Sequence, residues 1–379
     1  MQKLQKMKFI SFIFFLFIFT IISKAQIGKY GNEFLNIGSS ARDMGMGNAS
    51  VASNYDGSCI YSNPANLTHI QAKNEINLLH SEYFASIAKY DFLNYTHKIN
   101  DSSTIAFSLI RMGIDNIQNT LYLYDANGNP DYSRIKYFSV SDYAFFASYA
   151  KKLPIEGLSI GANAKIIYRH FGEFANAYGF GIDVGIKYIY KKWLLAAMLK
   201  DATSTFTAWF FSINDTIANI FKQTGNQLPK NSLEIILPSL YMGIARNFKI
   251  NNKNSLLFEQ DLIFYFDGKR NAIVSFNPIS IYPRYALEWN YNKRIFLRGG
   301  LSNFQYASSF ARDTTIYRKH VLSLSPSLGI GLRIGRFRVD YALTNIANIG
   351  IGLYSHVFSI KIIIDKNYNS IYRQFSYYK

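Results

Sequence analysis

The chain has little cysteine and little charge. Cys59 is the only cysteine among 379 residues, which excludes a disulfide framework and any site built from several thiolates. Charged residues make up 17% of the chain, which argues against a disordered chain or a coiled coil. The 29 Tyr and 31 Phe residues suit the half-buried surfaces of pleated strands. The composition therefore indicates an all-β protein.

Patterns of catalytic and metal-binding residues are missing as well. The Gly-x-Gly pairs at 179–181 and 329–331 lie inside predicted strands and not at a strand-to-helix turn, which argues against a dinucleotide site. We expect no enzyme activity, no metal and no cofactor. The histidines are scattered without the spacing of metal ligands: His69, His80, His97, His170, His320 and His356.

The basic excess does not indicate nucleic acid. The 41 Lys and Arg residues outnumber the 24 acids, but they are dispersed through the chain instead of forming a stripe. We expect their counter-ions to be the phosphates of lipid head groups at the outer surface.

The first 25 residues read as a signal peptide. Lys3, Lys6 and Lys8 precede an apolar run over 9–22, which is too short for a membrane helix of about 20 residues. Small residues at Ser23 and Ala25 predict cleavage after Ala25. With no later apolar span, the exported chain is either soluble or a β-barrel.

Alternation of side chains decides between these two classes. Leu328, Ile330 and Leu332 share one face of a predicted strand, whereas Ser327 and Gly331 share the other. Such a period of two, with Phe, Tyr and Leu on one face and Gly, Ser, Asn and mixed charge on the other, is typical of a membrane barrel. The alternative is a secreted sandwich or solenoid whose strands pack on a second sheet.

Fourteen strands are predicted, an even number, as bacterial barrels require. Short and long connections alternate, as expected for periplasmic turns and outer loops. The strands are placed near 74–84, 89–99, 103–113, 140–151, 156–171, 177–190, 192–200, 233–248, 253–266, 282–292, 295–304, 320–334, 336–344 and 354–364. The resulting divisions are a signal peptide (1–25), a plug segment (26–71), a transmembrane antiparallel barrel (72–364) and a tail (365–379).

Mixed charges fall on the faces predicted to line the lumen. Because both signs are present, we expect these charges to pair with one another and fix a plug, and we do not expect an ion filter, which would carry one sign. The alternative is that the charged side chains simply face water. The set is Lys165, Asp183, Lys187, Glu259, Asp261, Glu288, Arg298, Arg333, Arg338, Asp340 and Lys361.

The segment before the first strand resembles a known family. The runs 34–49 (FLNIGSSARDMGMGNA) and 61–67 (YSNPANL) resemble the start of the PorV/PorQ proteins of type IX secretion. Those proteins are similar to the FadL class of outer-membrane hydrophobe transporters, whose fourteen-stranded barrels carry an N-terminal hatch with an Asn-Pro-Ala element. The resemblance implies a FadL-like barrel in the outer membrane. Its plug residues would be Arg42, Asp43, Asn63, Pro64 and Ala65.

The residues of the Asn-Pro-Ala element also predict a local structure independently of the resemblance. Pro64 fixes its backbone, lacks an N–H and pushes Asn63 toward extended geometry, so the tripeptide predicts a rigid polar corner. The alternative is an ordinary turn at the start of a helix.

An outward loop predicted at 201–232 is rich in apolar residues. An apolar patch that does not face lipid usually meets a partner; the alternative is that these side chains belong to the interfacial girdle or cap the barrel mouth. The candidate partner-binding residues are Phe206, Trp209, Phe210 and Phe211.

Two functions follow from the resemblance. The first is a secretion accessory that binds the C-terminal signal domains of exported cargo, works with other secretion-system subunits and passes the cargo on for release or surface attachment. The alternative is a transporter of hydrophobic small molecules through a gated, plugged barrel.

Overall fold

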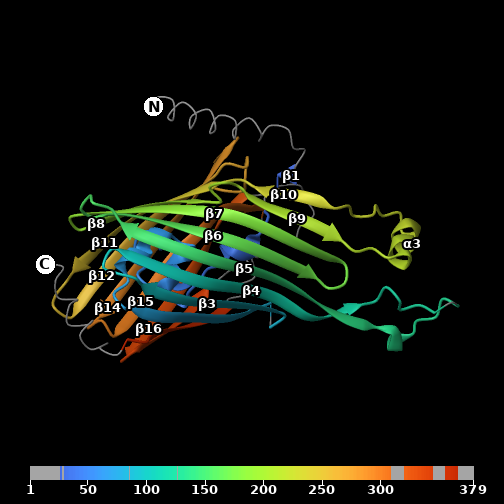
Figure 1. The fold of residues 1–379 in the computed structure, drawn as a ribbon, viewed down its shortest axis with the longest axis horizontal. Helices are drawn as coiled ribbons and strands as arrows, with labels where there is room; N and C mark the ends of the chain where they lie inside the picture. The colour runs from blue at the N-terminus through green and yellow to red at the C-terminus, as the bar shows by residue number, and fades with distance from the viewer. Residues whose placement is uncertain are drawn as a thin grey trace, which may run out of the picture.

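Fourteen wall strands form a closed barrel in the described part of the chain (Figure 1). The computed structural model describes residues 26–27, 30–84, 86–125, 127–308, 320–344 and 355–365. The predicted signal peptide and nearly all of the predicted tail lie outside these residues. The wall strands are β2 (Asn74–Tyr83), β3 (Ala88–Lys98), β4 (Ser103–Asn119), β5 (Lys136–Lys152), β6 (Leu158–Phe171), β7 (Ala175–Tyr190), β8 (Trp193–Lys200) continued by β9 (Thr205–Phe211), β10 (Ser232–Ile236) continued by β11 (Ser239–Lys249), β12 (Asn254–Tyr265), β14 (Ile279–Tyr291), β15 (Ile295–Ser308), β16 (His320–Ile334), β17 (Phe337–Thr344) and β18 (Ser355–Ile363).

The barrel closes where its last strand meets its first. β18 pairs antiparallel with β2, with Ser359 opposite Leu79. The other neighbouring wall strands also pair antiparallel. The predicted fold class, an antiparallel fourteen-stranded barrel, is confirmed.

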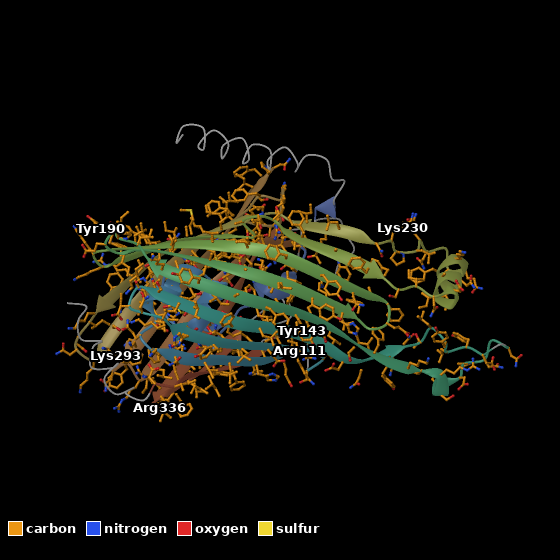
Figure 2. The ribbon with its side chains drawn as sticks, viewed as in Figure 1. Arg111, Tyr143, Tyr190, Lys230, Lys293 and Arg336 are labelled. Atoms are coloured by element: carbon orange, nitrogen blue, oxygen red, sulfur yellow. The ribbon has the colours of Figure 1, made fainter. Side chains whose placement is uncertain are left out.

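Side chains alternate between the outer surface and the lumen. On β7, Phe180 and Ile186 are exposed on the outside, whereas Asp183 and Lys187 point inward and are buried. Figure 2 shows the side chains that surround the wall. No helix among the described residues is both long and apolar enough to span a bilayer. The apolar outer surface of the closed cylinder meets hydrocarbon, and the protein is located in the outer membrane.

The two ends of the barrel differ in the length of their connections. Short turns join β3 to β4, β5 to β6, β7 to β8, β11 to β12, β14 to β15 and β16 to β17; we call this the short-turn end. At the other end, the long-loop end, the β4–β5 and β9–β10 connections carry η5 (Tyr132–Arg134) and α3 (Asp215–Gln223) and project from the barrel (Figure 1). The predicted sorting of loop lengths is confirmed. Outer-membrane barrels turn their short connections toward the periplasm, so we expect the short-turn end to face that side.

Two predicted boundaries were wrong. The segment 201–232 is not all loop, because β9 and β10 continue the wall and pair with each other. Thr205 and Thr207 are buried while Phe206 is exposed, so alternation persists there. The β4–β5 pair also extends farther than predicted, past a bulge between Ile114 and Ile117.

The segment 30–73 lies inside the barrel and we call it the plug. It contains η2 (Glu33–Asn36), α2 (Ala41–Gly45), η3 (Gly57–Tyr61) and η4 (Pro64–His69). α2 packs against β15 to β18, and η4 packs against β4 to β7 on the other side. The plug therefore crosses the lumen. The divisions at 71 and 364 stay predictions.

Glycines on the inner face of the wall give the plug its room. A Cβ on Gly300 would lie 2.1 Å from the carbonyl carbon of Met46, and one on Gly161 would lie 2.5 Å from that of Pro64. A side chain at either position would occupy space that the plug backbone fills.

Candidate functional site

The Asn-Pro-Ala element begins η4 inside the barrel. The side-chain oxygen of Asn63 accepts a hydrogen bond from the Ala65 N–H (3.0 Å), and its amide nitrogen donates to the backbone oxygens of Ile186 (3.0 Å) and Ala197 (3.3 Å). Pro64 sits in the first turn, where a missing N–H costs nothing. The element is thus a helix-start turn, and it is also a polar corner fixed to β7 and β8.

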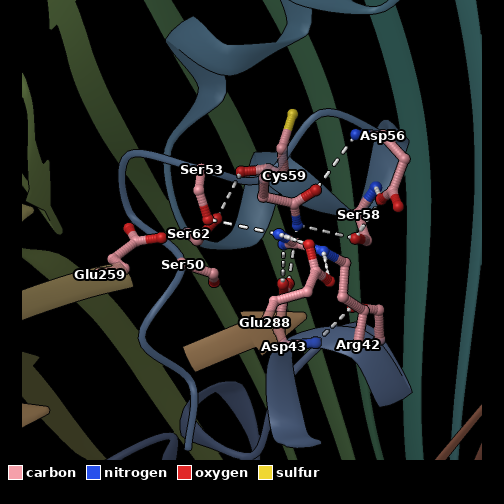
Figure 3. Close-up of polar contacts among 12 residues, drawn as sticks. Arg42, Asp43, Ser50, Ser53, Asp56, Ser58, Cys59, Ser62, Glu259 and Glu288 are labelled. Atoms are coloured by element: carbon pink, nitrogen blue, oxygen red, sulfur yellow. Dashed lines mark hydrogen bonds and ion pairs between the residues drawn. The ribbon is translucent and has the colours of Figure 1, made fainter. Parts of the chain in front are cut away.

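Arg42 and Asp43 lie on α2 and are both buried. Arg42 Nε donates to Glu288 Oε2 (3.1 Å) on β14, and Asp43 Oδ2 accepts from Asn54 Nδ2 (2.7 Å). Figure 3 shows this cluster. Burial raises the pKa of Asp43 to about 6, although Arg42 opposes the shift. One short helix therefore links the plug to the wall through a buried ion pair.

A chain of ion pairs extends from that contact through the wall. Arg298 Nε lies 2.6 Å from Glu288 Oε2, and Arg298 Nη1 lies 2.7 Å from Asp340 Oδ1. Arg338 Nε contacts Asp340 (2.7 Å), and its Nη2 contacts Asp56 of the plug. The chain joins β14, β15 and β17 to the plug at two points. The prediction that lumen charges pair with one another to fix a plug is confirmed for these residues.

Two wall carboxylates hold the plug by its backbone. Asp261 Oδ2 accepts from the N–H groups of Ser50 (2.8 Å) and Val51 (3.2 Å), and Glu259 Oε1 accepts from that of Ala52 (2.7 Å). Both carboxylates are buried. Since these bonds use no plug side chain, this anchor does not depend on which side chains the plug carries at those positions.

Lys165 and Lys361 are paired within the wall, whereas Lys187 Nζ lies 4.3 Å from the ring centroid of Tyr55 in the plug. Lys165 Nζ lies 2.7 Å from Asp183 Oδ1 and 2.5 Å from Asp201 Oδ1, and Lys361 Nζ lies 2.7 Å from Glu75 Oε2. The lumen therefore holds neutralised pairs beside the plug, an arrangement that suits closure better than selection of ions.

The wall is interrupted in its long-loop half, at a place that we call the seam. The β11–β12 ladder ends at Ser239 and Tyr265, and Pro238, which follows Leu237, has no N–H to continue it. Beyond this point, β1 (Gln26–Ile27) is the one described segment that pairs with the edge of β10; it runs parallel to β10 opposite residues 234 and 235. Within the described residues β13 (Val274–Phe276), across the seam, pairs with β14 alone.

A stack of aromatic and basic side chains lies across the seam. The guanidinium of Arg270 lies 3.8 Å from the ring centroid of Tyr265 and 4.8 Å from that of Tyr30, and it also pairs with Asp267 (2.5 Å). Behind the stack a cavity of about 30 Å³ lies between the seam and η2, with Lys200 in its lining. It has room for only one or two water molecules. The seam is therefore narrow but lightly bonded.

The four aromatic residues predicted as a partner-binding loop lie on β9, in the wall. Phe206 and Phe210 are exposed on its outer surface. Trp209 Nε1 donates to Glu234 Oε2 (3.2 Å) on β10, and the Trp209 ring stacks on Phe211. Their loop location was wrong because the alternation of β9 continues through them. Their binding of a partner stays a prediction.

Cys59 and His69 both lie in the plug, where Cys59 is fully buried and His69 is partly buried. Cys59 is buried in η3, and burial raises the pKa of its thiol well above the usual value. Burial also lowers the pKa of His69 to about 2. Within the part of the chain that is described, no group of three or more His, Cys, Asp or Glu side chains is arranged to hold a metal ion.

Sequence reasoning missed the seam. The contacts of Tyr30 and Arg270 join segments far apart in the chain, and no local pattern signals them. Pro238 was a usable signal, because a proline in the middle of the strand predicted at 233–248 indicates an edge or a break.

Comparisons with known proteins are limited to similarities of structure. No family model and no curated protein matches the chain. It is similar to a monoaromatic hydrocarbon channel, CymD (14% identity, 86% of this chain and 97% of that one, TM-score 0.49). It is also similar to the Pseudomonas putida toluene transporter TodX (14%, 86% and 96%, 0.48) and to a Pseudomonas aeruginosa FadL homologue (11%, 85% and 97%, 0.47). The resemblance to PorV/PorQ stays a prediction, and the architecture rests on the strand pairing described above.

Proposed function

We propose that this barrel transports hydrophobic small molecules, which enter from the long-loop end and pass through the seam while the plug keeps the lumen closed to water. The observation that carries the proposal is the seam itself. Between neighbouring wall strands elsewhere the described ladders are long, for example β6–β7 over 158–171, whereas β1 covers β10 over two residues.

Among the described residues, opening the seam breaks few backbone hydrogen bonds. A strand pair that separates within hydrocarbon leaves its backbone groups without partners, at several kcal/mol each, so a long ladder stays closed. The surroundings of the seam are apolar, since Phe266 and Val274 are exposed on the outer surface beside it. A hydrophobic molecule at an open seam would therefore contact apolar side chains and the acyl chains of lipids.

The test is a reversible lock that holds β1 on the edge of β10. Ile27→Cys with Ile235→Cys, in a Cys59→Ser background, joins β1 to β10 at directly opposed positions. The lock should abolish uptake of a fluorescent long-chain fatty acid by proteoliposomes, and a reductant should restore it. Leu233→Cys with Ala208→Cys, across the neighbouring β9–β10 ladder, is the matched control and should leave uptake unchanged. No uptake by the reduced protein would exclude the transport function.

A secretion accessory is the second candidate, and the projecting long-loop end favours it. The β4–β5 extension and α3 stand clear of the barrel (Figure 1), in the position where a barrel meets an exported protein. Such a barrel would receive the signal domains of cargo together with other secretion subunits.

Cross-linking in intact cells tests this second function. Capture of cargo domains or of a large translocon subunit would support it, whereas purification with bound acyl chains and no protein partner would support transport. Trp209→Ala with Phe210→Ala should weaken capture if β9 contributes to docking. Phe107→Ala with Tyr149→Ala, which removes two exposed outer-wall aromatics nearer the short-turn end, should not.

A further inference from the structure

Cationic side chains gather at the short-turn end. The described residues that form the turns there, or lie at or next to the strand ends, carry acids only at Glu75, Asp101, Glu156 and Asp365. Asp101 is paired with Lys98 (2.9 Å), and Glu75 is paired with Lys361 (2.7 Å). The cations of this ring are Lys73, Lys98, Lys151, Lys152, Lys191, Lys192, Lys249, Lys253, Lys293, Arg294 and Arg336. Figure 2 labels Lys293 and Arg336 at this end. The expectation that lipid phosphates at the outer surface balance the basic residues stays a prediction; among the described residues, the cations gather at the opposite, short-turn end.

The long-loop end is different, because there the described residues carry both signs. Arg134 pairs with Asp131 (3.1 Å), and Arg169 pairs with Asp142 (2.7 Å). Among the described residues, the excess of positive charge therefore lies at the short-turn end. A ring of one sign at a membrane boundary attracts anionic head groups.

One part of the ring also has a hollow beside it. A hollow of about 560 Å³ lies at the β14–β15 and β16–β17 turns, within the size range of small-ligand sites. Its apolar lining comes from outward-facing side chains that are exposed: Tyr291, Ile295, Leu332 and Ile334. Arg294 and Arg333 complete it, and the Arg333 N–H donates to the Arg294 carbonyl oxygen (2.8 Å), which joins the two turns.

We propose that this hollow binds one anionic phospholipid of the periplasmic leaflet. The acyl chain lies along the four apolar side chains, and the phosphate lies among the cations of the two turns, Arg294 and Arg336 included. The geometry suits this ligand because the apolar lining is continuous with the outer wall and the charges stand at its periplasmic border. Arginine is suited to phosphate because its planar fork can donate two parallel hydrogen bonds.

Native mass spectrometry of the full-length protein in neutral detergent provides the test. After incubation with phosphatidylglycerol, the wild type should retain one lipid, while phosphatidylcholine at the same concentration should be retained less. Arg294→Gln with Arg336→Gln should weaken retention of phosphatidylglycerol by about tenfold or more, as expected for two cations near one head group.

Lys151→Gln with Lys152→Gln is the matched control. It removes the same charge from the β5–β6 turn on the opposite side of the ring, far beyond the screening length of about 8–10 Å, and should leave retention unchanged. Circular dichroism establishes that both variants keep the barrel. Equal retention by the two double variants, or displacement of the lipid by inorganic phosphate at equal concentration, would overturn the proposal. The result does not depend on what the barrel transports.

Discussion

At the scale of single residues, the buried charges explain how a polar plug stays inside an apolar environment. Arg298 shows the arrangement most clearly, because its side chain is fully buried between Glu288 and Asp340. A buried ion pair adds little net stability, but removing one partner leaves an uncompensated charge. These contacts therefore matter chiefly by making other positions of the plug unfavourable.

Arg298→Met should lower the free energy of unfolding by about 3–5 kcal/mol, because two buried carboxylates lose their common partner. Urea titration in detergent measures the change. Lys98→Met, at an exposed pair, should change the midpoint little. Equal effects of the buried and exposed changes would contradict the account.

Asp43 should make stability depend on pH. Burial raises the pKa of Asp43 to about 6, above the value of about 4 in an unfolded chain. Its contribution is therefore fully present below pH 4 and is lost as the pH rises through 6, by at most about 3 kcal/mol. Asp43→Asn should remove this slope in urea titrations between pH 4 and pH 7. The lowered pKa of Asp56, held by Arg338 against the effect of burial, acts in the opposite direction, but below pH 4.

At the scale of elements, alternation predicted the strands and their order, because one face of each must meet lipid. It failed at β9 and β10. There the consecutive apolar residues Trp209 to Phe211 do not alternate with polar ones, so the strand was predicted as a loop. The break at Pro238 was not predicted either. The position of α2 and η4 against particular strands could not be read from the chain, since those contacts depend on which wall residues lack a side chain. The sequence predicted that lumen charges would pair with one another, but it could not predict which residues form each pair.

The glycines of β15 give a matched test of plug packing. Gly300→Ala should displace the plug, because its Cβ would overlap the backbone of Met46 and Gly47. Gly299→Ala, on the next residue, has only Leu328 Cδ2 within 4.0 Å and should be tolerated. Thermal unfolding followed by gel mobility compares the two variants. Similar melting temperatures would show that the plug does not touch the wall at Gly300.

At the scale of the whole molecule, barrel and plug form one closed body. A cylinder of fourteen strands is wider than side chains alone can fill, and here the segment 30–73 occupies the space. Wall glycines and wall carboxylates both contact the backbone of the plug. Access to the lumen therefore requires either movement of the plug or separation at the seam.

Cys59 can report which of these occurs. In the intact protein a water-soluble maleimide should not label it at pH 7.5, because the thiol is buried and its pKa is raised, so the reactive thiolate is scarce. Arg42→Ala with Asp56→Ala should speed labelling at least several-fold if the plug moves as a unit. Ile27→Cys with Ile235→Cys, oxidised and made in a chain that keeps Cys59, should leave the rate unchanged. Rapid labelling of the wild type would mean that the lumen is already open.

The pairing of β18 with β2 also constrains how the nascent protein is assembled. The cylinder cannot close until residues 356–363 reach residues 75–82, and partners so distant in sequence make folding slow. The plug precedes all wall strands and already bonds to the last one, through the Ala41 N–H and Ser359 Oγ (3.0 Å). It can therefore serve as a template around which the sheet curls, and a chain truncated before residue 355 would reach the periplasm with two open edges and be cleared by proteases.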